Sequence, residues 1–263
     1  MCGFLKKEGK IEMKCTLEVC VDSVQSALEA QKAKADRIEL CSNLIIGGTS
    51  PGKALFQQVR YYTDLKIRVL LRPRFGDFCY DKYEFTQMKE EAEMYRELGA
   101  DAIVTGILCP DGTLNVEQMQ GLIKAADGLE FTLHRAFDMC QDAFMALEQA
   151  VELGIGTILT SGQKNSAWEG RKLLKELAEK SAGRVEILAG AGITPDVIGK
   201  LVSYTKITAY HMSGKVVKDS AMEFRRTGVN MGIPGFSEYE IWQTDAEKIR
   251  EAAEVLKGVC KDD

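Results

Sequence analysis

The chain has 263 residues, of which 45% are hydrophobic and 28% charged, as expected for one globular domain. The net charge of −5, without a long basic run or a basic–aromatic pattern, argues against a nucleic-acid partner. No apolar segment approaches the ~20 residues that a membrane helix needs. The first residues lack the apolar core of a signal peptide, so we expect a cytoplasmic protein without a membrane partner.

Strand and helix patterns alternate from residue 16 to the end of the chain. Short apolar runs rich in β-branched residues predict strands, and longer amphipathic, charged runs predict helices, several of which end at glycine. In chain order, the predicted strands are Thr16–Val21, Arg37–Cys41, Ile67–Arg72, Ala102–Leu108, Phe131–Arg135, Thr157–Ser161, Val185–Gly190 and Ile207–Met212. This alternation indicates βαβ units and a parallel sheet.

Eight such units predict a single-domain α/β protein with the (β/α)₈ architecture of a TIM barrel, over residues 14–263. An open doubly wound sheet remains the alternative, because closure is inferred only from the number of units. Residues 1–13 precede the repeating pattern and are expected to form a mobile N-terminal extension. Residues 216–244 follow the last strand and predict a long loop, which is either a lid or subunit contact or a plain surface excursion.

Alternation along the strands places charged and thiol side chains inside the barrel. Glu18 and Cys20 alternate with aliphatic residues in the first strand, as do Glu39 and Cys41 in the second, and His134 follows the same pattern in the fifth. Barrel enzymes carry their active sites at the C-terminal ends of the strands. We therefore expect a functional site there, with Glu18, Glu39 and His134 as candidate acid–base residues.

Two arginines lie near the end of the third strand. Buried carboxylates need partners, and Arg72 and Arg74 are the expected partners of Glu18 and Glu39. The same arginines are candidates for holding an anionic substrate at the barrel mouth.

Glycine-rich turns after the seventh and eighth predicted strands suggest a second part of an anion site. Gly190, Gly192 and Ser213 lie in these turns, at the position where barrels frequently bind phosphate. Such turns also need glycine for conformational reasons alone.

Cys20 and Cys41 form a candidate Cu(I) site, since soft thiolates favour this ion. Adjacent strands, equal height and inward orientation would bring their sulfur atoms together, with His134, His211, Met139 or Met212 completing the site. The alternative is two buried thiols without a metal. All eight cysteines of the chain are expected to stay reduced, because disulfide frameworks belong to short secreted chains.

The residues alone leave three interpretations. The charged, arginine-lined barrel mouth favours an enzyme acting on a small anionic or phosphorylated metabolite, provided that the environment separates the pKa values of the two glutamates. The alternatives are a Cu(I)-binding protein and a non-catalytic scaffold in which an ion-pair network only closes the barrel.

A series of motifs resembles the CutC family of copper homeostasis proteins and covers nearly the whole chain from Leu17 onward. In order, the motifs are LEVCVDS, ADRIELCSN, IGGTSP, LRPRFGDF, LGADAIVTGIL, TLHRAFD, ILTSGQ, AGAGIT, HMSG and MEFRRTGVNMG. The resemblance implies a TIM barrel that assembles as a dimer or higher homo-oligomer. It also implies copper tolerance and copper binding, with Cys20 and Cys41 as ligands and the copper ion as partner.

The chain departs from the family pattern at two turns. It has His211-Met212-Ser213 where many relatives have HGS, so that a bulkier methionine would narrow the pocket or offer a thioether. It has Gly190-Ala191-Gly192 in place of three glycines.

Overall fold

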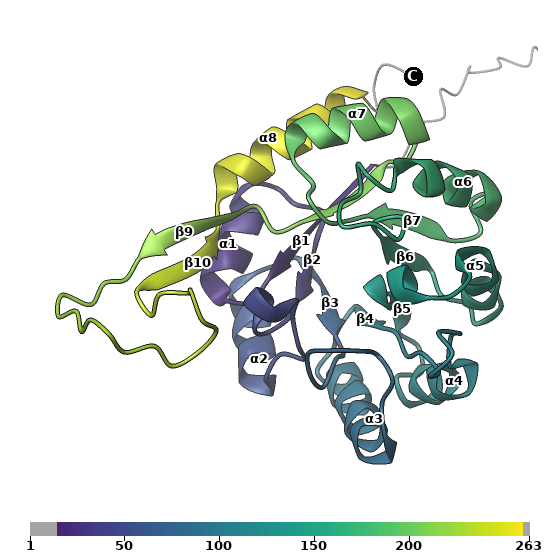
Figure 1. The fold of residues 1–263 in the computed structure, drawn as a ribbon, viewed down its shortest axis with the longest axis horizontal. Helices are drawn as coiled ribbons and strands as arrows, with labels where there is room; N and C mark the ends of the chain where they lie inside the picture. The colour runs from purple at the N-terminus through teal and green to yellow at the C-terminus, as the bar shows by residue number, and fades with distance from the viewer. Residues whose placement is uncertain (1–14, 260–263) are drawn as a thin grey trace, which may run out of the picture.

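The computed structural model describes residues 15–259, in which eight parallel strands close into a barrel. Each strand pairs with the next along the chain, and the eighth pairs with the first (Figure 1). The strands are β1 (Thr16–Val21), β2 (Arg37–Leu40), β3 (Lys66–Leu70), β4 (Ala102–Thr105), β5 (Glu130–Leu133), β6 (Thr157–Thr160), β7 (Glu186–Ala189) and β8 (Ala209–Met212). The predicted (β/α)₈ barrel is confirmed. The predicted extension, residues 1–13, lies outside the described residues.

Helices form a ring around the barrel, each following one strand (Figure 1). They are α1 (Val24–Lys32), α2 (Lys53–Tyr62), α3 (Lys82–Glu97), α4 (Val116–Ala125), α5 (Ala143–Glu152), α6 (Arg171–Ser181), α7 (Pro195–Thr205) and α8 (Ala246–Val259), with short 3₁₀ turns η1 (Leu44–Ile46) and η2 (Arg135–Met139). Their starts follow from local sequence. Asp81 and Glu84 form a capping box at α3, and Thr194 caps α7 ahead of Pro195.

The main hydrophobic core lies between the outer face of the barrel and the helices. Alternate strand residues such as Val19, Ile38, Ile67 and Ile103 are fully buried there. Burying a side chain of this size contributes roughly 1.5–3 kcal/mol. The strand register brings the other residues inside: Glu18 lies beside Arg37 in the β1–β2 pair, and the cysteine two residues later lies beside Glu39.

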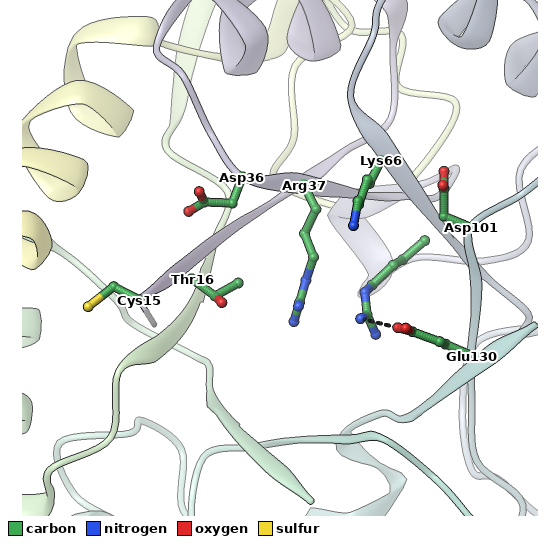
Figure 2. A pocket seen from close by; sticks show the side chains of 8 residues that line it. Cys15, Thr16, Asp36, Arg37, Lys66, Asp101 and Glu130 are labelled. Carbon is green, nitrogen blue, oxygen red and sulfur yellow. Dashed lines mark hydrogen bonds and ion pairs between the residues drawn. The ribbon is translucent and has the colours of Figure 1, made fainter. Parts of the chain in front are cut away.

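The N-terminal end of the barrel holds a buried ion-pair network around a cavity of about 370 Å³ (Figure 2). Arg37 donates to Glu18 Oε2 at 2.5 Å and to Glu186 at 2.8 Å. Arg68 Nη2 donates to Glu130 at 2.9 Å, the contact drawn as a dashed line in Figure 2, and its Nε lies 3.7 Å from Glu18. The two arginines and Glu18 are buried, whereas the Glu130 side chain is largely exposed.

The segment after β8 forms a hairpin rather than a plain loop. β9 (Lys215–Asp219) and β10 (Glu240–Thr244) pair in antiparallel fashion and extend to one side of the barrel (Figure 1). Large apolar side chains between them are exposed, among them Phe224 and Met231. Among the described helices, none is both long and apolar enough to cross a membrane.

Candidate functional site

A cysteine, a glutamate and a histidine from three neighbouring strands converge inside the upper barrel. Cys20 on β1, Glu39 on β2 and His211 on β8 each place a ligand atom within 4.8 Å of the other two. Closure of the barrel brings these three residues together, because β1 lies between β2 and β8 and pairs with both. His211 Nε2 lies 3.6 Å from Glu39 Oε2. This Cys20–Glu39–His211 cluster combines the three donor types that bind transition metals.

Glu18 orients the histidine of the cluster. Its Oε1 lies 2.9 Å from His211 Nδ1, which leaves Nε2 directed toward the glutamate and cysteine side chains. Burial would lower the pKa of His211, but Cys20, Glu39 and Glu18 outweigh burial and hold that pKa well above its usual value. A carboxylate behind a histidine is the arrangement that fixes the orientation of metal-binding imidazoles.

Glu18 is an ionised carboxylate at the centre of the barrel. Burial alone would raise its pKa, but the hydrogen bond from His211 and the charges of Arg37 and Arg68 lower it to about 2. The expected pairing of Glu18 with the arginines at the end of the third strand is therefore wrong. Its cationic partners come from lower in β2 and β3: the strand register pairs Glu18 with Arg37, and Arg68 Nε lies 3.7 Å from Glu18 Oε2.

Glu39 has the opposite protonation behaviour. Burial raises its pKa to about 7, with the charge of Glu18 adding to the increase and His211 opposing it. The two carboxylates therefore differ widely in pKa, which is the condition that acid–base chemistry requires of such a pair.

Cys41 does not belong to the Cys20–Glu39–His211 cluster. The register pairs Cys20 with Glu39, so the two cysteines are not at equal height, contrary to the expectation from sequence. Cys41 Sγ donates to the carbonyl oxygen of Val21 at 3.5 Å, and the side chain packs against Leu70. Burial raises the pKa of its thiol well above the usual value. The structure thus places Cys41 as a protonated thiol beside the cluster.

Five of the six described cysteines are free thiols, namely Cys20, Cys41, Cys79, Cys109 and Cys140. Cys15 is disulfide-bonded, contrary to the expectation that every cysteine stays reduced.

Arg72 and His134 line a cavity of about 370 Å³ that also reaches Cys20, Glu39 and His211. Arg72 is 8% exposed and His134 5%. Burial, and then the charge of Arg72, lower the pKa of His134 to about 3, so the ring is neutral. Both residues therefore lie at the barrel mouth, in a cavity that Glu39 also lines and Glu18 does not.

Arg74 points away from this cavity. Its guanidinium donates to Glu84 at 2.5 Å and to Asp77 at 2.9 Å, and it lies over the ring of Tyr80. The residue stabilises the 73–81 loop and the start of α3, so the structure does not bring it together with the other candidate anion-binding groups.

The glycine-rich turns line a second cavity of about 490 Å³, next to the first. Gly192 and Ser213 lie at its wall together with Cys20 and His211. Gly190 has a packing role, since a Cβ there would lie 2.6 Å from a methyl carbon of Leu159. The structure therefore brings two of the three candidate turn residues to the Cys20–Glu39–His211 cluster.

Asp138 connects η2 to the loop after β6. It accepts hydrogen bonds from Thr160 and Ser161 and from the backbone N–H of Gln163, and it pairs with Arg135 at 2.7 Å. These bonds explain the role of the sequence motifs HRAFD and TSGQ: they join the ends of the neighbouring strands β5 and β6. It fixes the backbone that carries His134.

Sequence reasoning missed Arg37 and Arg68 as barrel-interior residues. The signal was present, because Arg37 has the same parity as Glu39 and Arg68 the same parity as Arg72. The importance of His211 was harder to recognise, because alternation alone did not settle which way β8 faces.

The fold and the site define a (β/α)₈-barrel protein with a cysteine–histidine–glutamate cluster at its mouth. The CutC family model matches residues 15–216. A family protein CutC of Histophilus somni is 40% identical over 233 residues, covering 89% of this chain and 96% of that protein. The copper homeostasis protein cutC homolog of Homo sapiens is 40% identical over 244 residues, covering 92% and 89% respectively. The chain belongs to the CutC family.

Solved structures agree with this assignment. A crystal structure of a CutC protein from Streptococcus agalactiae superimposes with a TM-score of 0.73 at 31% identity, covering 76% of this chain and 99% of that one. A phosphoribosyl anthranilate isomerase from Thermococcus kodakaraensis gives a TM-score of 0.54 at 15% identity, covering 93% and 99%. This second likeness shows the barrel fold alone. The names of the family members associate it with copper homeostasis.

Proposed function

We propose that this protein binds Cu(I) as part of copper homeostasis, with Cys20 and His211 as the principal ligands. The observation that carries the proposal is the convergence of Cys20 Sγ and His211 Nε2 in the Cys20–Glu39–His211 cluster. Cu(I) favours soft thiolate ligands and also accepts imidazole, so one sulfur and one nitrogen form a suitable low-coordinate site. The copper homeostasis name of the human relative supports copper as the cargo.

Glu18 has a positioning role in this proposal. By accepting from His211 Nδ1–H it leaves the Nε2 lone pair for the metal once that nitrogen is deprotonated. Glu39 lies close enough to approach the ion, but a carboxylate is a hard ligand and contributes more to Zn²⁺ than to Cu(I). The identity of the metal therefore depends on the cysteine–histidine pair.

The test is an anaerobic titration of the reduced, metal-free protein with Cu(I) against a competing chelator, followed by the same titration with Zn²⁺. Cys20→Ser and His211→Asn each remove one proposed ligand. Cys140→Ser is the matched control, because Cys140 is also a buried thiol but lies outside the Cys20–Glu39–His211 cluster. Cys41→Ser tests the ligand that the family resemblance implies.

We expect one Cu(I) per chain, with affinity reduced at least 100-fold in Cys20→Ser and His211→Asn and unchanged in Cys140→Ser. A loss of similar size in Cys41→Ser would add Cys41 to the site. Tight binding of Zn²⁺ with weak binding of Cu(I), or Cu(I) binding indifferent to Cys20, would refute the proposal.

A further inference from the structure

We propose that the cavity lined by Arg72 and His134 binds a small organic monocarboxylate, whose oxygen atoms accept hydrogen bonds from Arg72 Nε and His134 Nε2. This inference is independent of the copper proposal, because it uses neither Cys20 nor His211 as a binding group.

Arg72 carries a buried positive charge without an anionic partner. Its Nη1 donates to the carbonyl oxygens of Gly47 and Gly48, at 3.3 and 3.1 Å, and its Nη2 donates to that of Gly76 at 2.9 Å. Its Nε is buried without a hydrogen-bond partner. Among residues 15–259, no carboxylate lies within ion-pair distance of this guanidinium. The other groups around it, the ring of Phe78 and the hydroxyl of Tyr80, are neutral as well, and a buried cation held only by neutral groups favours an anion beside it.

His134 supplies a second unpaired donor. Its Nδ1 accepts from the backbone N–H of Ala136 at 3.2 Å, and since the ring is neutral its proton lies on Nε2. Nε2 is also buried without a hydrogen-bond partner. Leaving such a donor unpaired costs roughly 1–3 kcal/mol, which a bound acceptor would remove.

The two donors lie against the same aromatic ring. The guanidinium carbon of Arg72 is 5.0 Å from the centroid of Phe78, and the His134 ring centroid is 4.9 Å from it. Phe78 belongs to the irregular 73–81 loop and is half-buried. Since both nitrogen atoms are covered by protein, a ligand reaches them only after side chains of the cavity wall, Phe78 among them, move.

The rest of the cavity wall determines the class of anion. Leu44, Leu70 and Leu159 line it and offer contact to a hydrocarbon body. The Glu39 carboxyl lies in the same cavity and disfavours a second negative charge. Arg135 also lines the cavity but is paired with Asp138, so the N–H donors of Arg72 and His134 remain for the two oxygens of a carboxylate. The glycine-rich turn that would suit phosphate lines the neighbouring cavity.

The test uses metal-free protein and measures binding of benzoate and hexanoate by calorimetry, with benzamide and inorganic phosphate as controls. In parallel, imidazole ¹⁵N spectra follow the His134 Nε2 resonance, which is readily assigned because the chain has two histidines. His134→Asn keeps an acceptor for the Ala136 N–H but removes the Nε2 donor, and His134→Gln keeps a donor near the Nε2 position. Arg72→Gln removes the charge, and Cys140→Ser is the control, because Cys140 is a buried thiol that does not line this cavity.

We expect saturable binding of at least one carboxylate with a shift of the Nε2 resonance. Affinity should fall at least tenfold in His134→Asn and Arg72→Gln and less than threefold in His134→Gln and Cys140→Ser. Because Arg72 also holds three carbonyl groups, the His134 pair remains decisive if Arg72→Gln fails to fold. Absence of carboxylate binding, equal binding of benzamide, or equal affinity of His134→Asn and wild type would overturn the inference. None of these outcomes affects the Cu(I) titration.

Discussion

The buried, neutral imidazole of His134 makes the stability of the protein depend on pH in a predictable direction. Its pKa falls from an ordinary value of 6.5 to about 3 in the folded chain, because burial and then the charge of Arg72 disfavour the protonated ring. Below pH 6.5 the unfolded chain therefore takes up a proton that the folded chain does not. Stability rises with pH wherever the unfolded state binds more protons, so this group destabilises the fold as pH falls from 6.5 toward 3.

The magnitude follows from the width of that window. The window begins at the unfolded pKa of 6.5, so acidification to pH 5 crosses roughly 1.5 pH units of it. Each unit corresponds to about 1.4 kcal/mol of unfolding free energy. His134 should therefore reduce the free energy of unfolding by about 2 kcal/mol at pH 5 relative to pH 7.5. His134→Asn cannot take up this proton and keeps an acceptor for the Ala136 N–H.

The assay is urea denaturation of wild type and His134→Asn at both pH values. The difference between the two proteins isolates this histidine, because Glu39 and the other titrating groups are present in both. His134→Asn will be less stable at pH 7.5, since it loses ring packing, but it should lose about 2 kcal/mol less than wild type on acidification. Equal losses in the two proteins, or a greater loss in the variant, would refute the neutral, buried state of His134.

Three further predictions concern the supports of the site, each measured by chemical denaturation. Arg37→Met leaves Glu18 without its closest cation and should reduce the free energy of unfolding by about 3–5 kcal/mol, whereas adding Glu18→Gln should restore part of the loss. Gly170→Ala would place a Cβ 1.9 Å from the carbonyl oxygen of Ser161 and should cost more than about 2 kcal/mol, whereas Gly232→Ala, with nothing within 4 Å, should be nearly neutral. Asp138→Asn weakens the charge-assisted bonds between η2 and the β6 loop and should cost about 1.5–3 kcal/mol.

The architecture could be predicted from sequence because it depends on local periodicity. Period-two alternation in β1 and β2 was enough to place Glu18, Cys20, Glu39 and Cys41 inside the barrel, and the structure agrees. Repetition of strand and helix along one chain then left few architectures other than a closed barrel.

The partners of these residues could not be predicted in the same way, because they depend on the stagger between strands. Cys20 lies beside Glu39, so Cys41 is two positions further along the barrel axis. The same stagger brings Arg37 and Arg68 to Glu18 and leaves Arg72 near the mouth. Stagger is a property of the closed barrel as a whole and leaves no signal in any single strand.

The ion-pair network and the candidate functional site were alternatives at the level of sequence, but in the structure they share Glu18. Its Oε2 accepts from Arg37 and its Oε1 contacts His211 Nδ1. The cations below lower the pKa of Glu18, together with His211 itself, and so keep an ionised carboxylate available to orient the imidazole above. A network that only closed the barrel would not require the contact between Glu18 and His211. We infer that the lower network positions the histidine as well as stabilising the fold, so Glu18→Gln should weaken Cu(I) binding about 10–100-fold even where unfolding measurements show an intact barrel.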